Sequence, residues 1–221
     1  IVEDSYVYCN HLLTIAKKKV NIPIVAGGSM PTVVPQIIIE NPIIDYVVET
    51  EGEIAFIELL EALRVSKNKN KVDVSKVANL WYKEDGVAKK TGLMKYINMD
   101  DIPNQRLEFW DDKHFQKAYD GKLYTTGFFE ASRGCMHKCH YCINRAFQVF
   151  QEESGKARRN KSVDKIINEV KELHKERNFG LIMWTDDNFL ARNPKELDEL
   201  FSRWEKEIKV PYWINTCIET V

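Results

Sequence analysis

The chain has 221 residues, 44% hydrophobic and 29% charged, and its 32 Lys and Arg against 33 Asp and Glu give a net charge of −1. These values are typical of a globular protein with one large or two small domains. They exclude a globally basic nucleic-acid coat and a disordered polyelectrolyte. The sequence contains neither the run of about 20 apolar residues that a transmembrane helix needs nor a signal segment, so we expect a cytoplasmic protein.

The first elements predict an α/β arrangement. We expect a helix up to Lys19 and a buried strand over residues 22–26, which runs directly into Gly27 and Gly28. Paired glycines at the end of a strand let the backbone approach a ligand closely or adopt a positive φ. A helical segment should follow them.

A second strand-helix unit and a hairpin come next. Residues 44–49 have the composition of a strand, and Thr50–Glu53 has the form of a capping box that starts a helix to about Val65. Residues 67–71 form a polar break. Residues 80–89 predict a hairpin with an Asp-Gly turn.

The second half repeats the alternation after a linker. Residues 99–119, rich in acidic and aromatic side chains, are expected to link the two halves. Apolar spacing and capping residues then predict strands over 124–131, 181–184 and 211–217, and helices over 162–177 and from Pro194 onward. This order predicts right-handed crossovers and a parallel sheet.

Five cysteines carry the chemical information: Cys9, Cys135, Cys139, Cys142 and Cys217. An odd number without a signal segment favours reduced thiols over a disulfide framework. Three of them have the spacing C-x3-C-x2-C, which lets one loop direct three sulfurs at a common centre. Thiolates select zinc or iron–sulfur clusters, and His137 or His140 is the available fourth ligand for a zinc site. With three cysteines, a [4Fe–4S] cluster keeps one iron open.

Polar residues follow the strands at the same edge of the predicted sheet. The cysteine loop follows the strand at 124–131, and Thr185-Asp186-Asp187-Asn188 follows the next strand. Ligands bind at the carboxyl ends of parallel strands. The basic stretch 156–161 is either a contact to a carboxylate or phosphate or a solvated loop, and we favour the loop for Lys156 and Lys161.

The segment Ser132-Arg133-Gly134-Cys135-x3-Cys139-x-Tyr141-Cys142 resembles the signature of radical S-adenosylmethionine (SAM) enzymes. The resemblance implies that the three cysteines hold a [4Fe–4S] cluster and that SAM chelates its fourth iron. An electron from the cluster then cleaves SAM to methionine and a 5′-deoxyadenosyl radical. It also implies that Tyr141 packs near the adenine and that Asp186, Asp187 and Asn188 lie near the SAM amino group.

The first half resembles the C-terminal part of the cobalamin-binding domain that precedes many radical SAM domains. The matching segments are Ala26-Gly27-Gly28-x-x-Pro31-Thr32 and Asp45 to Glu53. The resemblance implies that Gly27 and Gly28 lie against the nucleotide tail of cobalamin. A D-x-H-x-x-G segment, which supplies a cobalt ligand in many relatives, does not occur in this sequence. It either precedes residue 1 or is not used.

The resemblance implies an α/β chain in which the C-terminal part of a Rossmann-like cobalamin-binding domain (1–70) precedes a hairpin and linker (71–120). The first βα units of a partial radical SAM barrel (121–221) complete it. A full eight-unit barrel takes about 250 residues, and the chain begins with Ile1 rather than Met. We therefore expect a fragment that lacks both ends and is inactive by itself.

The expected activity is SAM cleavage coupled to methyl transfer or radical rearrangement. The expected cofactors are a [4Fe–4S] cluster, SAM and cobalamin. The expected partners are a small-molecule or peptide substrate and an electron donor of the flavodoxin or ferredoxin type, without membrane or nucleic acid. The alternatives are a non-catalytic zinc or electron-transfer module and an enzyme like the tRNA-modifying methylthiotransferases.

Overall fold

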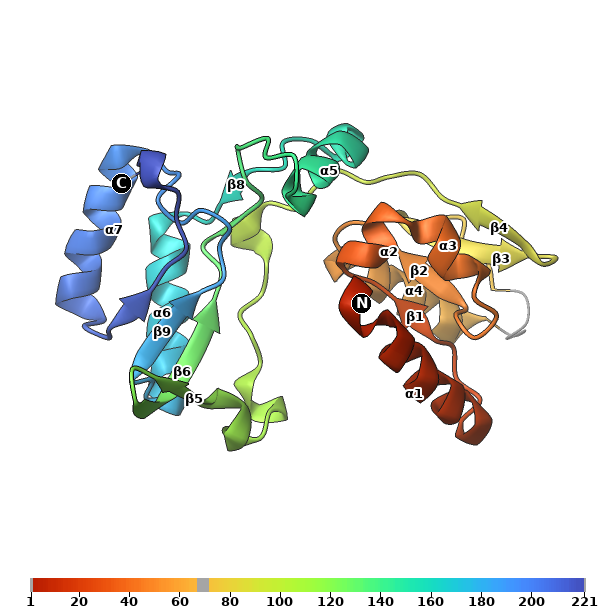
Figure 1. Ribbon diagram of the computed structural model, residues 1–221, viewed down its shortest axis with the longest axis horizontal. Helices are drawn as coiled ribbons and strands as arrows, with labels where there is room; N and C mark the ends of the chain where they lie inside the picture. The colour runs from red at the N-terminus through yellow and green to blue at the C-terminus, as the bar shows by residue number, and fades with distance from the viewer. Residues whose placement is uncertain (1, 67–71, 221) are drawn as a thin grey trace. The chain divides into compact units, whose positions relative to one another are not determined.

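The computed structural model describes residues 2–66 and 72–220, so the expected polar break at 67–71 lies outside the described residues. The chain divides into two compact units (Figure 1). Unit 1 comprises Ile1–Tyr96 and Lys138–Lys156, and unit 2 comprises Ile97–His137 and Ala157–Val221. The domain boundaries near residues 70 and 120 stay predictions.

Unit 1 is built on a four-stranded sheet with the order β1-β2-β3-β4. β1 (Val25–Ala26) is parallel to β2 (Tyr46–Val48), whereas β3 (Leu80–Glu84) and β4 (Val87–Lys90) continue the sheet in antiparallel fashion. The predicted Asp-Gly hairpin is confirmed: β3 and β4 are joined by two residues with positive φ, as a type I′ turn requires.

The parallel strands of unit 1 are shorter than the sequence predicts. The backbone amide of Ile24 donates to the Asp45 carboxylate at 2.7 Å rather than to a neighbouring strand. That carboxylate also receives Lys17 at 2.6 Å. A side chain therefore takes the place of the first rung of the ladder, and regular pairing begins one residue later.

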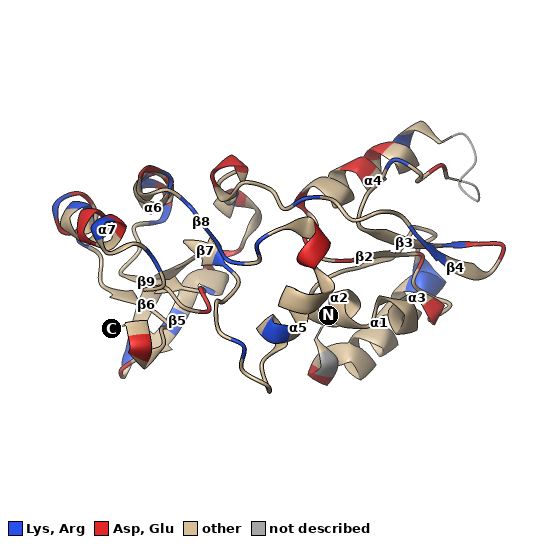
Figure 2. Ribbon diagram, turned by 90° about the horizontal axis from the view of Figure 1, so that it is seen from above, with Lys and Arg blue, Asp and Glu red and all other residues tan. Residues whose placement is uncertain are grey.

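Helices cover both faces of the unit 1 sheet (Figure 2). α1 (Tyr6–Lys19), α2 (Ser29–Val33) and α3 (Pro35–Glu40) lie on one face, and α4 (Glu53–Val65) lies on the other. The two cores follow this division: one holds Ala26, Ile38, Ile39, Ile44 and Val47, the other Val48, Ala55, Leu59, Val74, Val77 and Leu80. The predicted helix up to Lys19 is present as α1, and the predicted end of α4 at Val65 is correct.

The predicted capping box at Thr50 is wrong. α4 begins at Glu53, its N-cap is Gly52, and no side chain caps it. Thr50 has a φ of 69°, and its amide donates to the Thr32 hydroxyl at 3.1 Å. A box needs an extended N-cap residue three positions before the glutamate, and the left-handed Thr50 cannot serve as one.

Unit 2 contains the predicted parallel sheet. Its order is β10-β9-β6-β5. β6 (Lys122–Phe129), β9 (Leu181–Trp184) and β10 (Tyr212–Trp213) are parallel, which confirms the α/β prediction, and they do not close a barrel within the described residues. β5 (Gln116–Tyr119), expected as the end of a linker, is instead an antiparallel edge strand. It forms because Asp120 and Gly121 both take positive φ and make a hairpin turn.

α6 (Val163–Arg177) and α7 (Pro194–Glu207) lie side by side on one face of this sheet, as Figures 1 and 2 agree. The predicted N-cap Asn193 is present and accepts from the Lys195 amide at 3.0 Å; Ser162, expected as the first residue of its helix, is instead an N-cap that accepts from the Lys165 amide at 3.1 Å. The apolar sides of the two helices form one core with the strands, and it includes Ile166, Val170, Leu173, Ile182, Trp184, Leu200 and Trp204.

Smaller elements complete the fold. α5 (Ile143–Phe150), which was not predicted, starts directly after Cys142 and packs with α2 in unit 1. β7 (Ser132–Arg133) pairs with β8 (Arg159–Asn160). Short 3-10 turns occur at Glu3–Ser5, Met99–Asp101, Leu107–Phe109, Asp112–Phe115, Glu152–Ser154 and Ile218–Thr220. Among the residues that the structure describes, no helix is both long and apolar enough to cross a bilayer.

Candidate functional site

Two neighbouring parallel strands of unit 2 end together. Phe129 of β6 pairs with Trp184 of β9, and the next amide, that of Thr185, donates to the Phe129 carbonyl at 2.8 Å. The chain that enters the cysteine loop therefore starts beside residues 185–188, as the sequence predicted. In parallel sheets this edge is where ligands bind.

Asp186 is buried between these strand ends, with 1% of its surface exposed. Its two carboxylate oxygens accept from the Ala131 amide at 2.9 Å and from the Ser132 hydroxyl. Burial raises the pKa of the Asp186 carboxyl above its usual value, and the two hydrogen bonds and the guanidinium groups of Arg192 and Arg158 oppose that rise. The carboxylate ties the end of β9 to the chain that follows β6.

Two arginines surround this contact. Arg158 donates to the Ser132 hydroxyl at 2.6 Å, to the Gly134 carbonyl at 3.1 Å and to the Ala191 carbonyl at 3.0 Å. Arg192 donates to the carbonyls of Ala131 and Lys161. Burial lowers the pKa of both guanidinium groups, yet arginine stays charged at neutral pH.

The expectation that Lys161 lies in a solvated loop is wrong. Its side chain is 3% exposed and pairs with Glu169 of α6, itself 5% exposed, at 2.7 Å. The Lys161 amide donates to the Ala131 carbonyl at 2.8 Å. Lys156, by contrast, is exposed as expected. Arg158 and Lys161 of the basic stretch 156–161 thus bind the segment 131–134, which precedes the cysteine loop.

Gly134 determines the backbone conformation immediately before Cys135. It has a φ of +75°, and a β-carbon there would lie 2.7 Å from the carbonyl carbon of Ala157. The residues on either side of this contact pair as β7 and β8. Only glycine fits both the conformation and the space.

None of the three loop cysteines is joined in a disulfide within the described residues. Cys135 is half-buried and belongs to unit 2, whereas Cys139, exposed, and Cys142, half-buried, belong to unit 1. The Cys142 amide donates to the Cys139 carbonyl at 3.2 Å, and Cys142 is the N-cap of α5. Three reduced thiols in a loop of eight residues form a donor set that fits an iron–sulfur cluster or zinc.

The other expected SAM contacts differ in accessibility. Tyr141 is 93% exposed, and Asp187 is exposed. Asn188 is fully buried, and its amide oxygen accepts from the hydroxyls of Thr216 at 2.9 Å and Thr220 at 3.1 Å. Of the three residues 186–188, Asp187 is the one open to solvent.

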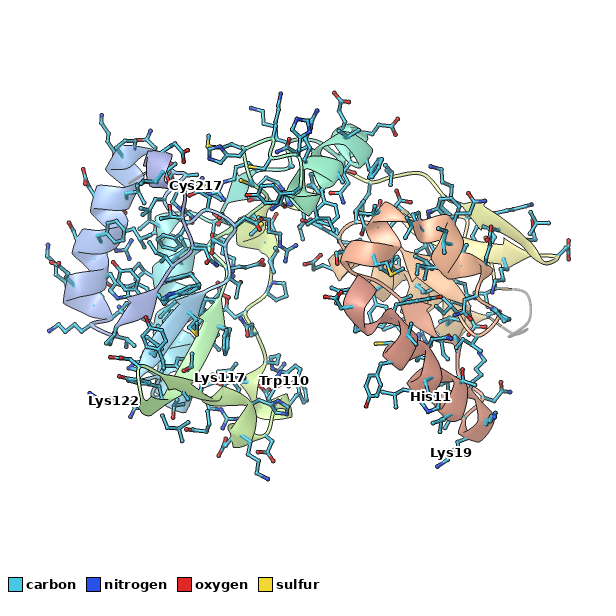
Figure 3. All side chains as sticks on the ribbon, in the orientation of Figure 1. His11, Lys19, Trp110, Lys117, Lys122 and Cys217 are labelled. Atoms are coloured by element: carbon cyan, nitrogen blue, oxygen red, sulfur yellow. The ribbon has the colours of Figure 1, made fainter. Side chains whose placement is uncertain are left out.

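A further group of possible metal ligands was missed by sequence reasoning. His137, Cys217 and Glu219 each place one ligand atom so that these atoms lie within 4.8 Å of one another. Cys217 lies in the segment after β10 (Figure 3). No local spacing connects residues 137 and 217, because only the parallel sheet brings them together.

In unit 1, Gly27 and Gly28 lie at the carboxyl end of β1, as predicted. They line a cavity of about 210 Å³ together with Val25, Ala26, Val48, Thr50, Gly52 and Phe56. Gly28 has a φ of 104°, and its carbonyl accepts from the Thr32 hydroxyl at 2.8 Å. The paired glycines therefore leave an open surface at the strand end.

A parallel βα sheet with a three-cysteine loop at its carboxyl edge defines a class of enzyme domain. Residues 129–221 match the family described as the Radical SAM superfamily, whose members use a [4Fe–4S] cluster and SAM. Residues 129–221 are therefore a radical SAM domain.

Two curated relatives extend the similarity into the first half. The chain is 33% identical over 181 residues to an uncharacterized methyltransferase of Pyrococcus horikoshii, which covers 80% of this chain and 36% of that protein. It is 29% identical over 183 residues to the anaerobic magnesium-protoporphyrin IX monomethyl ester cyclase of Synechocystis, which covers 82% and 34%. The chain thus spans about a third of the length of these relatives.

Solved structures show the same fold. The cobalamin-dependent SAM radical enzyme OxsB, with aqua-cobalamin and SAM bound, matches with a TM-score of 0.64 and 18% identity over 94% of this chain and 28% of that one. Its apo form matches with a TM-score of 0.62 and 17% identity, over 91% of this chain and 27% of that one. The match covers most of both units, so the predicted mixed α/β fold is confirmed.

Proposed function

We propose that the chain forms the cluster-binding and SAM-binding part of a cobalamin-dependent radical SAM enzyme. The observation that carries the proposal is the position of the cysteine loop. It follows β6 directly, at the edge where β9 also ends, inside the region that matches the superfamily. That is the edge of a parallel sheet at which this class of fold binds its ligands.

The three cysteines of the loop, Cys135, Cys139 and Cys142, hold the [4Fe–4S] cluster and leave its fourth iron for SAM. When bound, the cluster supplies the electron that cleaves SAM to methionine and a 5′-deoxyadenosyl radical. The exposed Tyr141 ring is available to pack on the adenine. The exposed Asp187 carboxylate is available to the SAM ammonium.

Cobalamin binding is proposed for unit 1. Its support is the cavity beside Gly27 and Gly28, together with the likeness of fold to OxsB, whose structure was solved with aqua-cobalamin bound. A glycine backbone at a strand end allows the close approach that a nucleotide tail needs. The alanine variant of Gly28 is therefore expected to weaken binding of hydroxocobalamin, whereas the alanine variant of Gly86, another positive-φ glycine of unit 1 with nothing within 4 Å, is not.

We propose methyl transfer or radical rearrangement as the outcome, on a small-molecule or peptide substrate. One relative is called a methyltransferase and the other a cyclase, and SAM with a labelled methyl group separates the two outcomes by the fate of the label. The electron donor is of the flavodoxin or ferredoxin type. We also propose a cytoplasmic location, and its support is the odd number of cysteines, which favours reduced thiols over a disulfide framework.

Anaerobic reconstitution with iron and sulfide tests the proposal. We expect a brown protein with absorption near about 400 nm and formation of 5′-deoxyadenosine on reduction in the presence of SAM. A colourless protein that contains zinc supports the structural zinc module instead. An iron–sulfur protein that never yields 5′-deoxyadenosine, with or without substrate, contradicts radical initiation.

A further inference from the structure

We infer that Asp186 is a positioning residue for the cysteine loop. Through Ser132 and Arg158 its buried carboxylate fixes the backbone that carries Cys135, and it does not bind the SAM amino group. The inference rests on the proposed function only for the identity of what the loop holds. The buried contacts stand independently of it.

Both oxygens of the Asp186 carboxylate already accept a hydrogen bond from the protein. One oxygen accepts from the Ala131 amide and the other from the Ser132 hydroxyl, and 1% of the residue is exposed. An ammonium group of a ligand would have to enter this closed space, either beside these donors or in place of one of them. The first needs the packed strand ends to open, and the second leaves a buried donor without its acceptor, so both are unfavourable.

The contacts continue from Asp186 to the residue before Cys135. The Ser132 hydroxyl donates to Asp186 and accepts from Arg158. The hydroxyl therefore acts as both donor and acceptor. The same guanidinium nitrogen of Arg158 donates to the Gly134 carbonyl. An uninterrupted series of hydrogen bonds thus connects the end of β9 with the peptide that joins Gly134 to the first cysteine.

Charge makes this series depend on the carboxylate. Arg192 is buried and Arg158 half-buried beside Asp186, and the negative charge of Asp186 is the largest influence that raises the pKa of each guanidinium group against the lowering by burial. The carboxylate of Glu196, 3.8 Å from Arg192, is half-exposed and contributes less. Neutralising Asp186 leaves two guanidinium groups facing each other, and a buried charge without its partner is strongly destabilising.

The test compares Asp186→Asn with the matched control Asp187→Asn, which changes the exposed neighbour by the same chemistry. Hydrogen exchange of residues 129–135 is measured in the cluster-free protein. The SAM dissociation constant and the iron content are measured after reconstitution. We expect exchange at Ala131 to accelerate about tenfold or more in Asp186→Asn and the iron content to fall. SAM affinity of the loaded fraction should stay within about threefold.

The opposite pattern overturns the inference. Unchanged exchange with a SAM dissociation constant raised about tenfold or more would make Asp186 a SAM ligand. If Asp186→Asn does not fold, Ser132→Ala takes its place, because it cuts the same series without changing charge, and unaltered exchange in that variant also contradicts the inference. If even the unmodified protein binds no cluster, the proposed function fails while the exchange result still decides the role of Asp186.

Discussion

Gly134 and Ala157 lie in contact across the entrance to the cysteine loop, so closely that a β-carbon at Gly134 would stand 2.7 Å from the Ala157 carbonyl carbon. This contact and the adjoining β7–β8 pairs hold the segment before the cysteine loop against the segment 157–160, which follows the loop and α5. The direction in which the chain continues from Gly134 to Cys135 is therefore set by backbone geometry.

Gly134→Ala is predicted to abolish cluster binding. The left-handed conformation costs a non-glycine residue about 1–2 kcal/mol, and the β-carbon also forces the backbone of Ala157 to move. Iron per chain after reconstitution should fall to background. Gly121→Ala is the control, because Gly121 has a similar φ of 69° with nothing within 4 Å; an equal loss of iron in both variants contradicts the steric account.

The buried pair of Lys161 and Glu169 gives a prediction on stability. Glu169→Ala should lower the free energy of unfolding by about 3–5 kcal/mol, because it leaves a buried ammonium without its partner. The double variant Lys161→Met with Glu169→Leu should recover most of that loss. Chemical denaturation checks both, with the exposed Glu172→Ala as control. If Glu169→Ala is no less stable than Glu172→Ala, the buried ion pair does not contribute to stability as described.

The Glu207 carboxylate gives a prediction on how the free energy of unfolding depends on pH below neutrality. Hydrogen bonds from Lys171 and Arg203, both at 2.8 Å, lower the pKa of its carboxyl below the usual value. A lowered pKa means that the stabilisation is present above about pH 4.5 and is lost as the pH falls through the folded-state pKa. Glu207→Gln should therefore be less stable than the unmodified protein at neutral pH, and the difference should shrink toward pH 3 and in high salt. A difference that does not change between pH 7 and pH 3 would rule this out.

Cys217→Ser separates the two groups of possible metal ligands. If the cluster is held by the loop cysteines alone, iron content and colour should match those of the unmodified protein. Cys9→Ser is the control in unit 1. A marked loss of iron in Cys217→Ser alone would mean that the group of His137, Cys217 and Glu219 takes part in metal binding.

Local patterns predicted much of the fold. The helix at 163–177 follows from apolar spacing, and the helix at 194–207 follows from apolar spacing and its N-cap residue Asn193. The hairpin at Asp85-Gly86 follows from turn chemistry. The same chemistry is present at Asp120-Gly121 and would have revealed β5, but the acidic and aromatic surroundings favoured a linker.

Long-range contacts at the site could not be predicted in the same way. Arg192 reaches Ala131 across 61 positions of the chain, and Ser132 meets Asp186 across 54. Only Glu169 left a local signal, since it is a charged residue on the apolar face of α6, between Ile166 and Leu173. The cysteine spacing predicted the chemistry of the loop, but not the buried residues that support it.

The most direct test of the central claim is the electron paramagnetic resonance spectrum of the reduced, reconstituted protein before and after addition of SAM. If three cysteines hold a [4Fe–4S] cluster with one open iron, the reduced-cluster signal should appear and should change on SAM binding. It should be absent from variants in which Cys135, Cys139 or Cys142 is replaced by alanine. A signal that SAM leaves unchanged, or one that survives loss of any of these three thiols, contradicts the account.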